Sequence, residues 1–444
     1  MVKTGGFLTL TLILILVLIS GCNPYQRTLH HSGNNDISIQ IIKEFEANYP
    51  FTGHKAIDWV SFETDLHKQL NYASYNDSAY LNIRELFFKL PDARINIISG
   101  KDQKLMKETT GGYCGFEVSR DESDQCIIIK VDSMSDAWSR GLRPGNKILG
   151  WNGTPVQEVL QNKCLIWGYH PADKEFRHIL QDYYLTRGPV GSSVELFYET
   201  ETGNNRGLRL DFVPKEIIFR PQHIGIPTGI PDKNFKIINE RTGIWTISAF
   251  SPSSLYEFKN EILPKLSQCQ NLIIDLRENQ GGNDAIAADL AGYFISEESL
   301  YDETLVRLAD TNTWNKLGHI HAEPKELIYE KSIIILIGPL CSGAGEGFAR
   351  VIADEENIQT LGLWSTYGSF SYPGGEIKIP GYFSIHYPIG MSLDENEVIL
   401  IESPGDYGGG IYPDIRIPVS SDLLIALSAG YDLLLDEAIM HLGR

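Results

Sequence analysis

The spacing of apolar residues changes twice along the chain and divides it into three parts. Over residues 37–105 apolar side chains such as Ile41 and Phe45 recur at three- and four-residue intervals, which predicts a helical N-terminal region. Residues 106–216 contain short apolar runs separated by Gly and Pro, which is typical of β-strands and turns. Over residues 217–444 apolar strands alternate with helical segments, which predicts an α/β unit. The fold class is therefore α/β with several domains.

The β-rich part is interrupted between Val156 and Arg187. Its short strand runs stop there, and the stretch from His170 to Tyr184 has the spacing of a helix. We therefore expect a helical insertion near residues 156–187 within a β-domain that spans residues 106–216.

The first segment of the chain predicts export. Lys3 is the only charge before the apolar run from Phe7 to Ile19, which has the length of a signal-peptide core. The residues that follow it, Ser20-Gly21-Cys22, resemble the bacterial lipobox. This resemblance implies cleavage of residues 1–21, lipid attachment at Cys22 and a polar tether over residues 22–36. A plain signal peptide with an incidental cysteine is the alternative.

Composition and charge limit the possible partners. Of 444 residues, 42% are hydrophobic and 21% are charged, as in ordinary globular proteins. A chain of this length is expected to form two or three units. Asp and Glu number 57 against 38 Lys and Arg, which gives a net charge of −19, and no basic stripe is present. We therefore expect no nucleic-acid partner, because such an acidic surface repels phosphate backbones.

The cysteines indicate neither a metal site nor a disulfide framework. Beside Cys22 the chain has an odd number of them, with no C-x-x-C pair and no histidine at zinc-finger spacing. Most lie in or beside apolar runs, where a small buried side chain is the ordinary explanation. The sequence predicts no cofactor and no metal. The five remaining cysteines are Cys114, Cys126, Cys164, Cys269 and Cys341.

The β-rich part resembles a PDZ domain. Tyr113-Cys114-Gly115-Phe116 matches the carboxylate-binding loop of that family, and Ala137 to Trp151 matches its helix, turn and following strand. The resemblance implies that backbone N–H groups of the loop bind the terminal carboxylate of a peptide, which adds a strand to the sheet edge. Protein or peptide C-termini are therefore the expected partners. A β-unit that serves only as a brace between domains is the alternative.

The α/β part contains four motif blocks, in order: Leu272–Arg277 with Gly281-Gly282, Ile333–Gly338 with Ser342–Glu346, Gly362 with Thr366–Gly368, and Gly409–Ile415. Behind a PDZ-like unit, these blocks resemble the C-terminal processing, or tail-specific, serine peptidases of the tricorn and processing peptidase superfamily. The resemblance implies a core of the ClpP/crotonase-like type and the chemistry of a serine peptidase.

The catalytic positions depart from that family pattern. The family places its serine three residues before the glutamate, where this chain has Gly343, so Ser342 lies one position early. Its lysine base corresponds to Ser369. Gly281 and Gly282 resemble the oxyanion loop, and with Gly343 they are the expected oxyanion donors.

Other routes to an activated serine also lack their residues. The tricorn-like branch uses a histidine where this chain has Arg94, which stays protonated at neutral pH. That branch also uses a glutamate where this chain has Tyr407. His386 is the remaining candidate base for Ser342, with Glu402 or Asp406 to orient it.

Two hypotheses follow from the sequence. The first is a PDZ-assisted serine endopeptidase that recognises protein C-termini and hydrolyses through an acyl-enzyme, with Ser342 as nucleophile. The second is an inactive peptide-binding lipoprotein on the same fold. In both, we expect a protein of the cell envelope, lipid-anchored through Cys22 to a bacterial membrane on its periplasmic or surface face.

Overall fold

The computed structural model describes residues 26–29, 37–71, 76–217, 234–239, 241–308, 313–326, 329–402 and 409–443. The signal peptide, Cys22 and most of the tether lie outside the described residues, as do Asp406 and Tyr407. The fold is mixed α/β, as the sequence predicts, and it contains several sheets.

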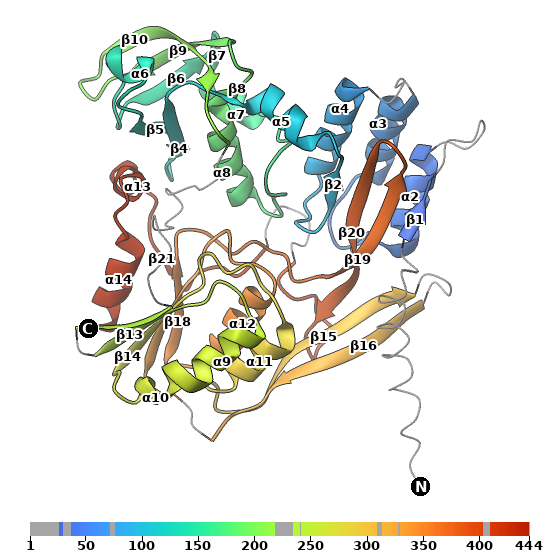
Figure 1. Ribbon diagram of the computed structural model, residues 1–444, viewed down its shortest axis with the longest axis vertical. Helices are drawn as coiled ribbons and strands as arrows, with labels where there is room; N and C mark the ends of the chain where they lie inside the picture. The colour runs from blue at the N-terminus through green and yellow to red at the C-terminus, as the bar shows by residue number, and fades with distance from the viewer. Residues whose placement is uncertain are drawn as a thin grey trace.

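Three helices of the N-terminal region pack side by side in chain order, and the fourth contacts the β-rich part instead (Figure 1). Their apolar faces contribute residues such as Ile41, Phe45 and Phe87 to the largest hydrophobic core. This burial follows from the three- and four-residue spacing, which gathers apolar side chains on one helix face. The helices are α2 (Ile37–Asn48), α3 (Trp59–Asn71), α4 (Asp77–Phe88) and α5 (Asp102–Thr110).

The β-rich part forms a small domain with its own core, at the top of Figure 1. Its main sheet has the order β10-β9-β6-β5-β4, and β11, β3 and β8 form a second sheet. Two helices, α7 (Val156–Gln161) and α8 (Lys174–Leu185), lie in the stretch predicted as a helical insertion. The other elements are β3 (Gly112–Tyr113), β4 (Phe116–Arg120), β5 (Cys126–Val131), α6 (Asp136–Ser139), β6 (Lys147–Trp151), β7 (Thr154–Pro155), β8 (Arg187–Gly188), β9 (Ser193–Glu199), β10 (Asn205–Asp211) and β11 (Val213–Pro214).

The α/β part is built on a mostly parallel sheet of order β12-β13-β14-β17-β18-β21. Its central strands are buried on both faces, so they read as continuous apolar runs in the sequence. Its strands are β12 (Phe235–Ile238), β13 (Thr242–Thr246), β14 (Asn271–Asp275), β17 (Ser332–Leu336), β18 (Ile358–Gly362) and β21 (Ile415–Arg416). Its helices are α9 (Pro252–Glu257), the π-helix η2 (Phe258–Ile262), α10 (Leu263–Leu266), α11 (Asp284–Ala291) and α12 (Ala344–Ile352).

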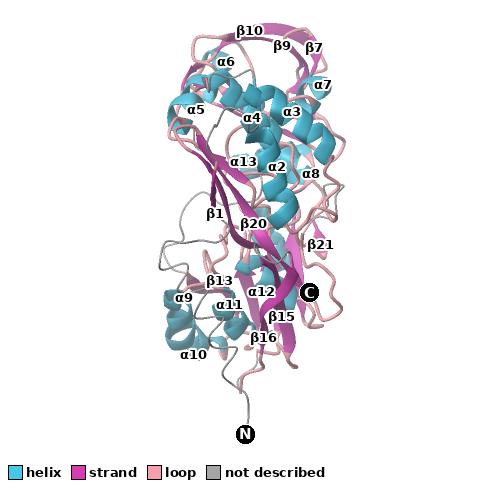
Figure 2. Ribbon diagram, turned by 90° about the vertical axis from the view of Figure 1, so that its right-hand side faces the viewer, coloured by secondary structure: helices cyan, strands magenta, loops and turns pink. Residues whose placement is uncertain are grey.

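A further sheet, of order β1-β19-β20-β15-β16, connects the helical region to the core. Its longest strand, β20, runs between the two parts in Figure 2 and also pairs with β2 from the helical region. The N-terminal helices are therefore tied to the core through backbone hydrogen bonds as well as side-chain packing. The strands are β1 (Gln26–Thr28), β2 (Asn96–Ile98), β15 (Ser299–Leu308), β16 (Thr313–Ala322), β19 (Tyr372–Ile379) and β20 (Phe383–Leu393).

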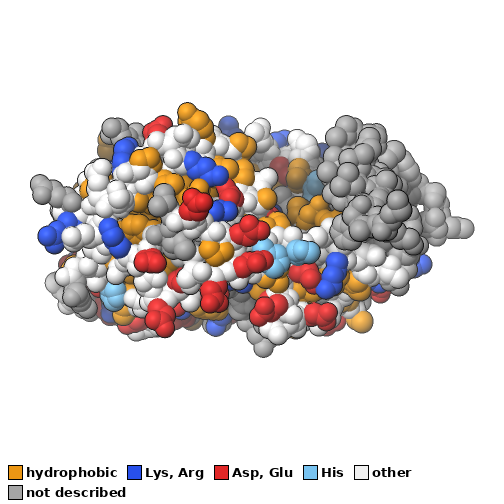
Figure 3. All heavy atoms as spheres, turned by 90° about the horizontal axis from the view of Figure 1, so that it is seen from below, with side chains coloured by type: hydrophobic (Ala, Val, Ile, Leu, Met, Phe, Trp, Pro, Cys, Tyr) orange, Lys and Arg blue, Asp and Glu red, His pale blue; other side chains and the backbone are white. Residues whose placement is uncertain are grey.

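The C-terminal helices α13 (Ser421–Ser428) and α14 (Leu433–Leu442) are held to the core by a buried arginine. Arg277 follows β14 and pairs with both Asp275, at 2.7 Å, and Asp432, at 2.6 Å. Within the described residues, no helix combines the length and apolar character that crossing a membrane requires. Acidic side chains are spread over the face in Figure 3, between smaller numbers of Lys and Arg.

Candidate active site

A strained turn joins β17 to α12. Gly343 is the last residue before the helix and has φ +55° and ψ −121°, a conformation that side chains rarely adopt. In acyl-transfer enzymes such a sharp strand-to-helix turn presents the nucleophile. Position 343 therefore keeps the backbone of a nucleophile turn but has no side chain.

The carboxylate of Glu346 joins this turn to the loop that follows β18. It is fully buried and accepts hydrogen bonds from the Gly343 N–H at 2.9 Å and the Thr366 hydroxyl at 2.6 Å. It also accepts hydrogen bonds from the Gly368 N–H at 2.6 Å, the Ser369 N–H at 2.9 Å and the Ser369 hydroxyl at 3.2 Å. Burial raises the pKa of Glu346, and these hydrogen bonds oppose that rise. The glutamate thus fixes the relative position of residues 343 and 369, the two expected catalytic positions.

The guanidinium of Arg94 fills the space beside Gly343. A Cβ atom placed on Gly343 would lie 3.1 Å from Arg94 Nη2. Arg94 donates two hydrogen bonds to the Ser369 carbonyl, from Nε at 3.1 Å and from Nη2 at 2.6 Å. A permanent cation therefore stands between the position expected for the nucleophile and the position expected for its base.

A buried ionic cluster holds Arg94 in place. Asp92 accepts the Arg94 N–H at 2.8 Å and lies 3.5 Å from the ammonium of Lys55, which in turn pairs with Glu402 at 2.6 Å. Glu402 also accepts the Ser371 N–H at 3.0 Å. Burial disfavours the charged ammonium, but the two carboxylates outweigh burial and raise the pKa of Lys55. Lys55 stays protonated, so it cannot serve as a general base.

Two of the three expected oxyanion donors are already occupied. The Gly343 N–H donates to Glu346, and the Gly281 N–H donates to the side-chain oxygen of Asn279 at 2.8 Å. We correct the prediction for these two residues. Among the described residues, the N–H groups of Gly282 and Ala344 have no acceptor, and Ala344 N lies close to Gly281, 3.2 Å from the position of a Cβ there. The sequence did not identify Ala344 as a donor, although the first N–H groups of a helix have no acceptor within the helix.

Ser342 is partly exposed beside this turn, and its hydroxyl has no hydrogen bond to a base among the described residues. The nearest polar contact given by its hydroxyl is the Asn279 carbonyl at 3.5 Å, which is too long for a strong hydrogen bond. Its neighbour Cys341 is fully buried, and burial raises the pKa of the Cys341 thiol far above its usual value. Cys341 therefore stays protonated and unreactive.

The structure contradicts the role expected for His386. It lies on β20, in a different sheet from β17, the strand that precedes Ser342, and its ring pairs with Glu376 across the hairpin at 3.9 Å. Glu402, expected to orient it, is instead committed to Lys55. Spacing along the sequence could not reveal this, because the hairpin β19-β20 leaves the core and joins another sheet.

The PDZ-like loop is closed in this structure. Tyr113 and Cys114 are each 3% exposed, and Phe116 is 0% exposed. Gly115 is also buried, and the Cys114 N–H donates to the Thr186 carbonyl at 3.3 Å. The geometry therefore does not present the loop to a terminal carboxylate.

The sheet edge beside that loop is also covered. Helix α8 packs along β4, where the Asp182 carboxylate accepts both the backbone N–H of Arg120, at 2.9 Å, and its guanidinium, at 2.7 Å. An added peptide strand needs free backbone groups at this edge. At Arg120, the Asp182 side chain of α8 accepts the backbone N–H that a peptide strand would otherwise bind.

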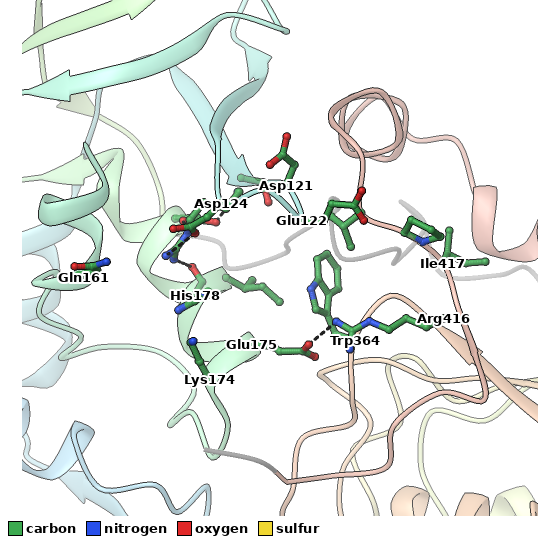
Figure 4. A pocket seen from close by; sticks show the side chains of 16 residues that line it. Asp121, Glu122, Asp124, Gln161, Lys174, Glu175, His178, Trp364, Arg416 and Ile417 are labelled. Atoms are coloured by element: carbon green, nitrogen blue, oxygen red, sulfur yellow. Dashed lines mark hydrogen bonds and ion pairs between the residues drawn. The ribbon is translucent and has the colours of Figure 1, made fainter. Parts of the chain in front are cut away.

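The insertion that carries α8 docks onto the core next to the candidate site. Asp173 caps α8 and accepts the Ser365 hydroxyl at 3.0 Å, and Ala172 lies against Gly368. A cavity of about 770 Å³ lies between the PDZ-like domain and the core, and Figure 4 shows the ion pair of Glu175 and Arg416 at its wall. The insertion thus braces the loop that positions Ser369.

Residues 241–417 match the model of the family described as peptidase family S41. This part of the chain is similar to peptidase family S41. The chain is 24% identical over 316 residues to the carboxy-terminal processing protease CtpB of Bacillus subtilis (strain 168), a match that covers 64% of this chain and 60% of that protein. The predicted resemblance to the processing peptidases is confirmed.

Solved structures support the same fold. Mature CPAF in complex with lactacystin has a TM-score of 0.63 at 15% identity, over 91% of this chain and 98% of that one. A putative peptidase of Parabacteroides merdae has a TM-score of 0.51 at 15% identity, over 93% and 97% of the two chains. The part similar to family S41 has glycine at Gly343 and serine at Ser369, and Arg94 reaches it from the helical N-terminal region.

Proposed function

We propose that this chain is a lipid-anchored protein of the bacterial cell envelope that binds peptides or protein C-termini on a processing-peptidase fold without hydrolysing them. The single observation that carries the proposal is the position of Arg94, whose guanidinium occupies the space of a side chain at Gly343. Acyl transfer needs a nucleophile and a base in hydrogen-bond contact. Here a cation and a glycine stand in those places.

The rest of the site supports retention of a binding surface. Glu346 still fixes the turn and the neighbouring loop through five hydrogen bonds. Two backbone N–H groups, of Gly282 and Ala344, remain available to an acceptor among the described residues. Preorganised donors of this kind bind anionic or carbonyl oxygens whether or not a reaction follows.

Anchoring and localisation rest on the sequence alone. The apolar run that ends before Ser20-Gly21-Cys22 supports lipid attachment at Cys22. Metabolic labelling with an alkyne-palmitate tests it: the wild-type protein should carry the label and Cys22→Ala should not. Labelling of both proteins, or of neither, would refute the lipid anchor.

Two measurements on the purified protein without its signal peptide test the binding function. We expect no covalent labelling by a fluorophosphonate probe, and saturable binding of a fluorescent peptide pool with free C-termini. The Ser342→Ala variant should behave like the wild type in both assays. Labelling of the wild type that disappears in Ser342→Ala would overturn the proposal.

A serine endopeptidase that uses Ser342 is the second candidate. The observation that favours it is the pair of unoccupied N–H groups at Gly282 and Ala344, which lie beside the partly exposed Ser342. This activity requires the turn to rearrange so that the Ser342 hydroxyl replaces the missing side chain at position 343. Fluorophosphonate labelling lost in Ser342→Ala would establish it.

A further inference from the structure

The cation beside the strained turn is Arg94. Within the described parts of the chain, Arg94 forms no ion pair with a carboxylate, and its hydrogen-bond acceptor is the neutral Ser369 carbonyl. The chain as a whole carries a net charge of −19, so acidic groups are plentiful elsewhere. A guanidinium fork left without a carboxylate is suited to an anion from outside the chain.

Asp284 is an acidic group whose charge interacts with Arg94. It is the first residue of α11, and it accepts a hydrogen bond from the Tyr301 hydroxyl at 3.2 Å rather than from the guanidinium. Burial raises the pKa of Asp284. Its carboxyl group therefore accepts from Tyr301, and the Arg94 N–H groups that do not bond to the Ser369 carbonyl have no carboxylate acceptor among the described residues.

Backbone donors surround the same point. The position of a Cβ on Gly343 lies 3.1 Å from Arg94 Nη2 and 3.7 Å from Gly281 Cα. The Ala344 N–H follows Gly343 directly, and the Gly282 N–H follows Gly281. Both N–H groups lack an acceptor among the described residues, and they belong to residues next to Gly281 and Gly343, two glycines that lie close together near the guanidinium.

We infer that Arg94, with the N–H groups of Gly282 and Ala344, forms a binding site for the terminal carboxylate of a peptide chain. The inference rests on the proposed peptide-binding function and names the part of the peptide that this site holds. A carboxylate has two oxygens, so one can accept from the guanidinium while the other accepts from the backbone groups. A neutral amide end offers one acceptor and no charge.

This site also accounts for the closed PDZ-like loop. The loop at Cys114 and Gly115 is buried, and its N–H at Cys114 is already bonded to Thr186. The chain end is then recognised where the helical region, through Arg94, meets the part similar to family S41. In a peptidase that cuts a chain, the new carboxylate forms at the scissile position, so the site here holds a peptide as a product would be held.

Defined tripeptides test the assignment. Three peptides are titrated into protein labelled with ¹⁵N at Gly and Ala. They are acetyl-Ala-Ala-Ala with a free carboxylate, the same peptide as an amide, and acetyl-Ala-Asp-Ala amide. We expect the free acid to shift the amide signals of Gly282 and Ala344, and the neutral amide to leave them unchanged. Loss of a charge-assisted hydrogen bond costs a factor of about 10 to 100 in affinity, and we expect that loss in Arg94→Gln. Arg94→Lys should retain part of the affinity.

The control is Arg140→Gln, which removes the same charge from an exposed ion pair on α6. Equal shifts by the free acid and its amide, no shift by either, or unchanged affinity in a folded Arg94→Gln would overturn the inference. If the Asp peptide binds as well as the free acid, the site takes carboxylates in general and the assignment to chain ends fails. A peptide pool that binds wild type and Arg94→Gln equally would overturn this site but leave the proposed function standing. If the peptide pool does not bind the wild type and the fluorophosphonate probe labels it, both this inference and the proposed function are refuted.

Discussion

A double-mutant cycle between Gly343 and Arg94 tests the central geometric finding. The strained backbone at Gly343 costs about 1–3 kcal/mol when a side chain must adopt it. Gly343→Ala also places its methyl group 3.1 Å from Arg94 Nη2, shorter than the 3.4–4 Å of ordinary contacts. The guanidinium must then shift and weaken its hydrogen bonds to the Ser369 carbonyl, which adds about 1 kcal/mol.

The cycle separates these two costs. We expect Gly343→Ala to lower the free energy of unfolding by about 2–4 kcal/mol in the wild type, and by about 1 kcal/mol less when Arg94 is alanine. Urea unfolding followed by tryptophan fluorescence measures all four proteins. The coupling isolates the contact, because backbone strain is present in both backgrounds.

Gly145→Ala is the matched control. Gly145 has φ +90°, and a Cβ there would lie 2.6 Å from Oε1 of Glu201, the end of a side chain in the β-rich domain. It should destabilise the protein without coupling to Arg94→Ala. Additive effects of Gly343→Ala and Arg94→Ala would refute the conclusion that the guanidinium fills the nucleophile space.

Three further changes test other parts of the structure. Burial raises the pKa of Asp173 from 3.8 to about 7, so the folded state binds the proton more tightly and the free energy of unfolding falls as the pH rises from about 4 to 7. Asp173→Asn should remove this slope, at most about 4 kcal/mol, in urea unfolding at pH 4.5 and 7.5; an unchanged slope would contradict the assignment. Asp432→Ala should cost about 1–3 kcal/mol, because Arg277 loses one of two carboxylate partners and keeps Asp275, and limited proteolysis should then cleave α14 first; equal resistance would argue against a role of this ion pair in holding α14. The double variant Gly343→Ser, Arg94→His should gain fluorophosphonate labelling that neither single variant has, and a folded but unlabelled double variant would show that more than these two side chains is missing.

The S41 resemblance and the α/β class could be predicted because both rest on local patterns. The apolar runs of β14 and β17 and the glycines at 281 and 282 keep their order and spacing along the chain. Sequence spacing also identified Gly343 as the residue in the nucleophile position. The strained φ of Gly343 supports that alignment.

Contacts between distant segments could not be predicted. The sequence around Arg94 shows only that this residue cannot be a base. It contains no pattern that predicts the hydrogen bond to the Ser369 carbonyl, 275 residues away. The pairing of Lys55 with Glu402 spans 347 residues and removes Glu402 from any role beside His386. A single sequence carries no signal for such pairs, since each member has an ordinary local explanation.

The persistence of a strained turn without a nucleophile has a physical explanation in Glu346. Its carboxylate needs the Gly343 N–H and the donors of Ser369 at fixed positions, because a buried carboxylate without them is costly. Glycine adopts the required φ without the steric cost that a side chain pays. The turn is therefore maintained by the packing of the fold, independently of catalysis. The turn holds N–H groups in fixed positions beside the Arg94 cation. We propose that this arrangement binds a carboxylate and does not form one by hydrolysis.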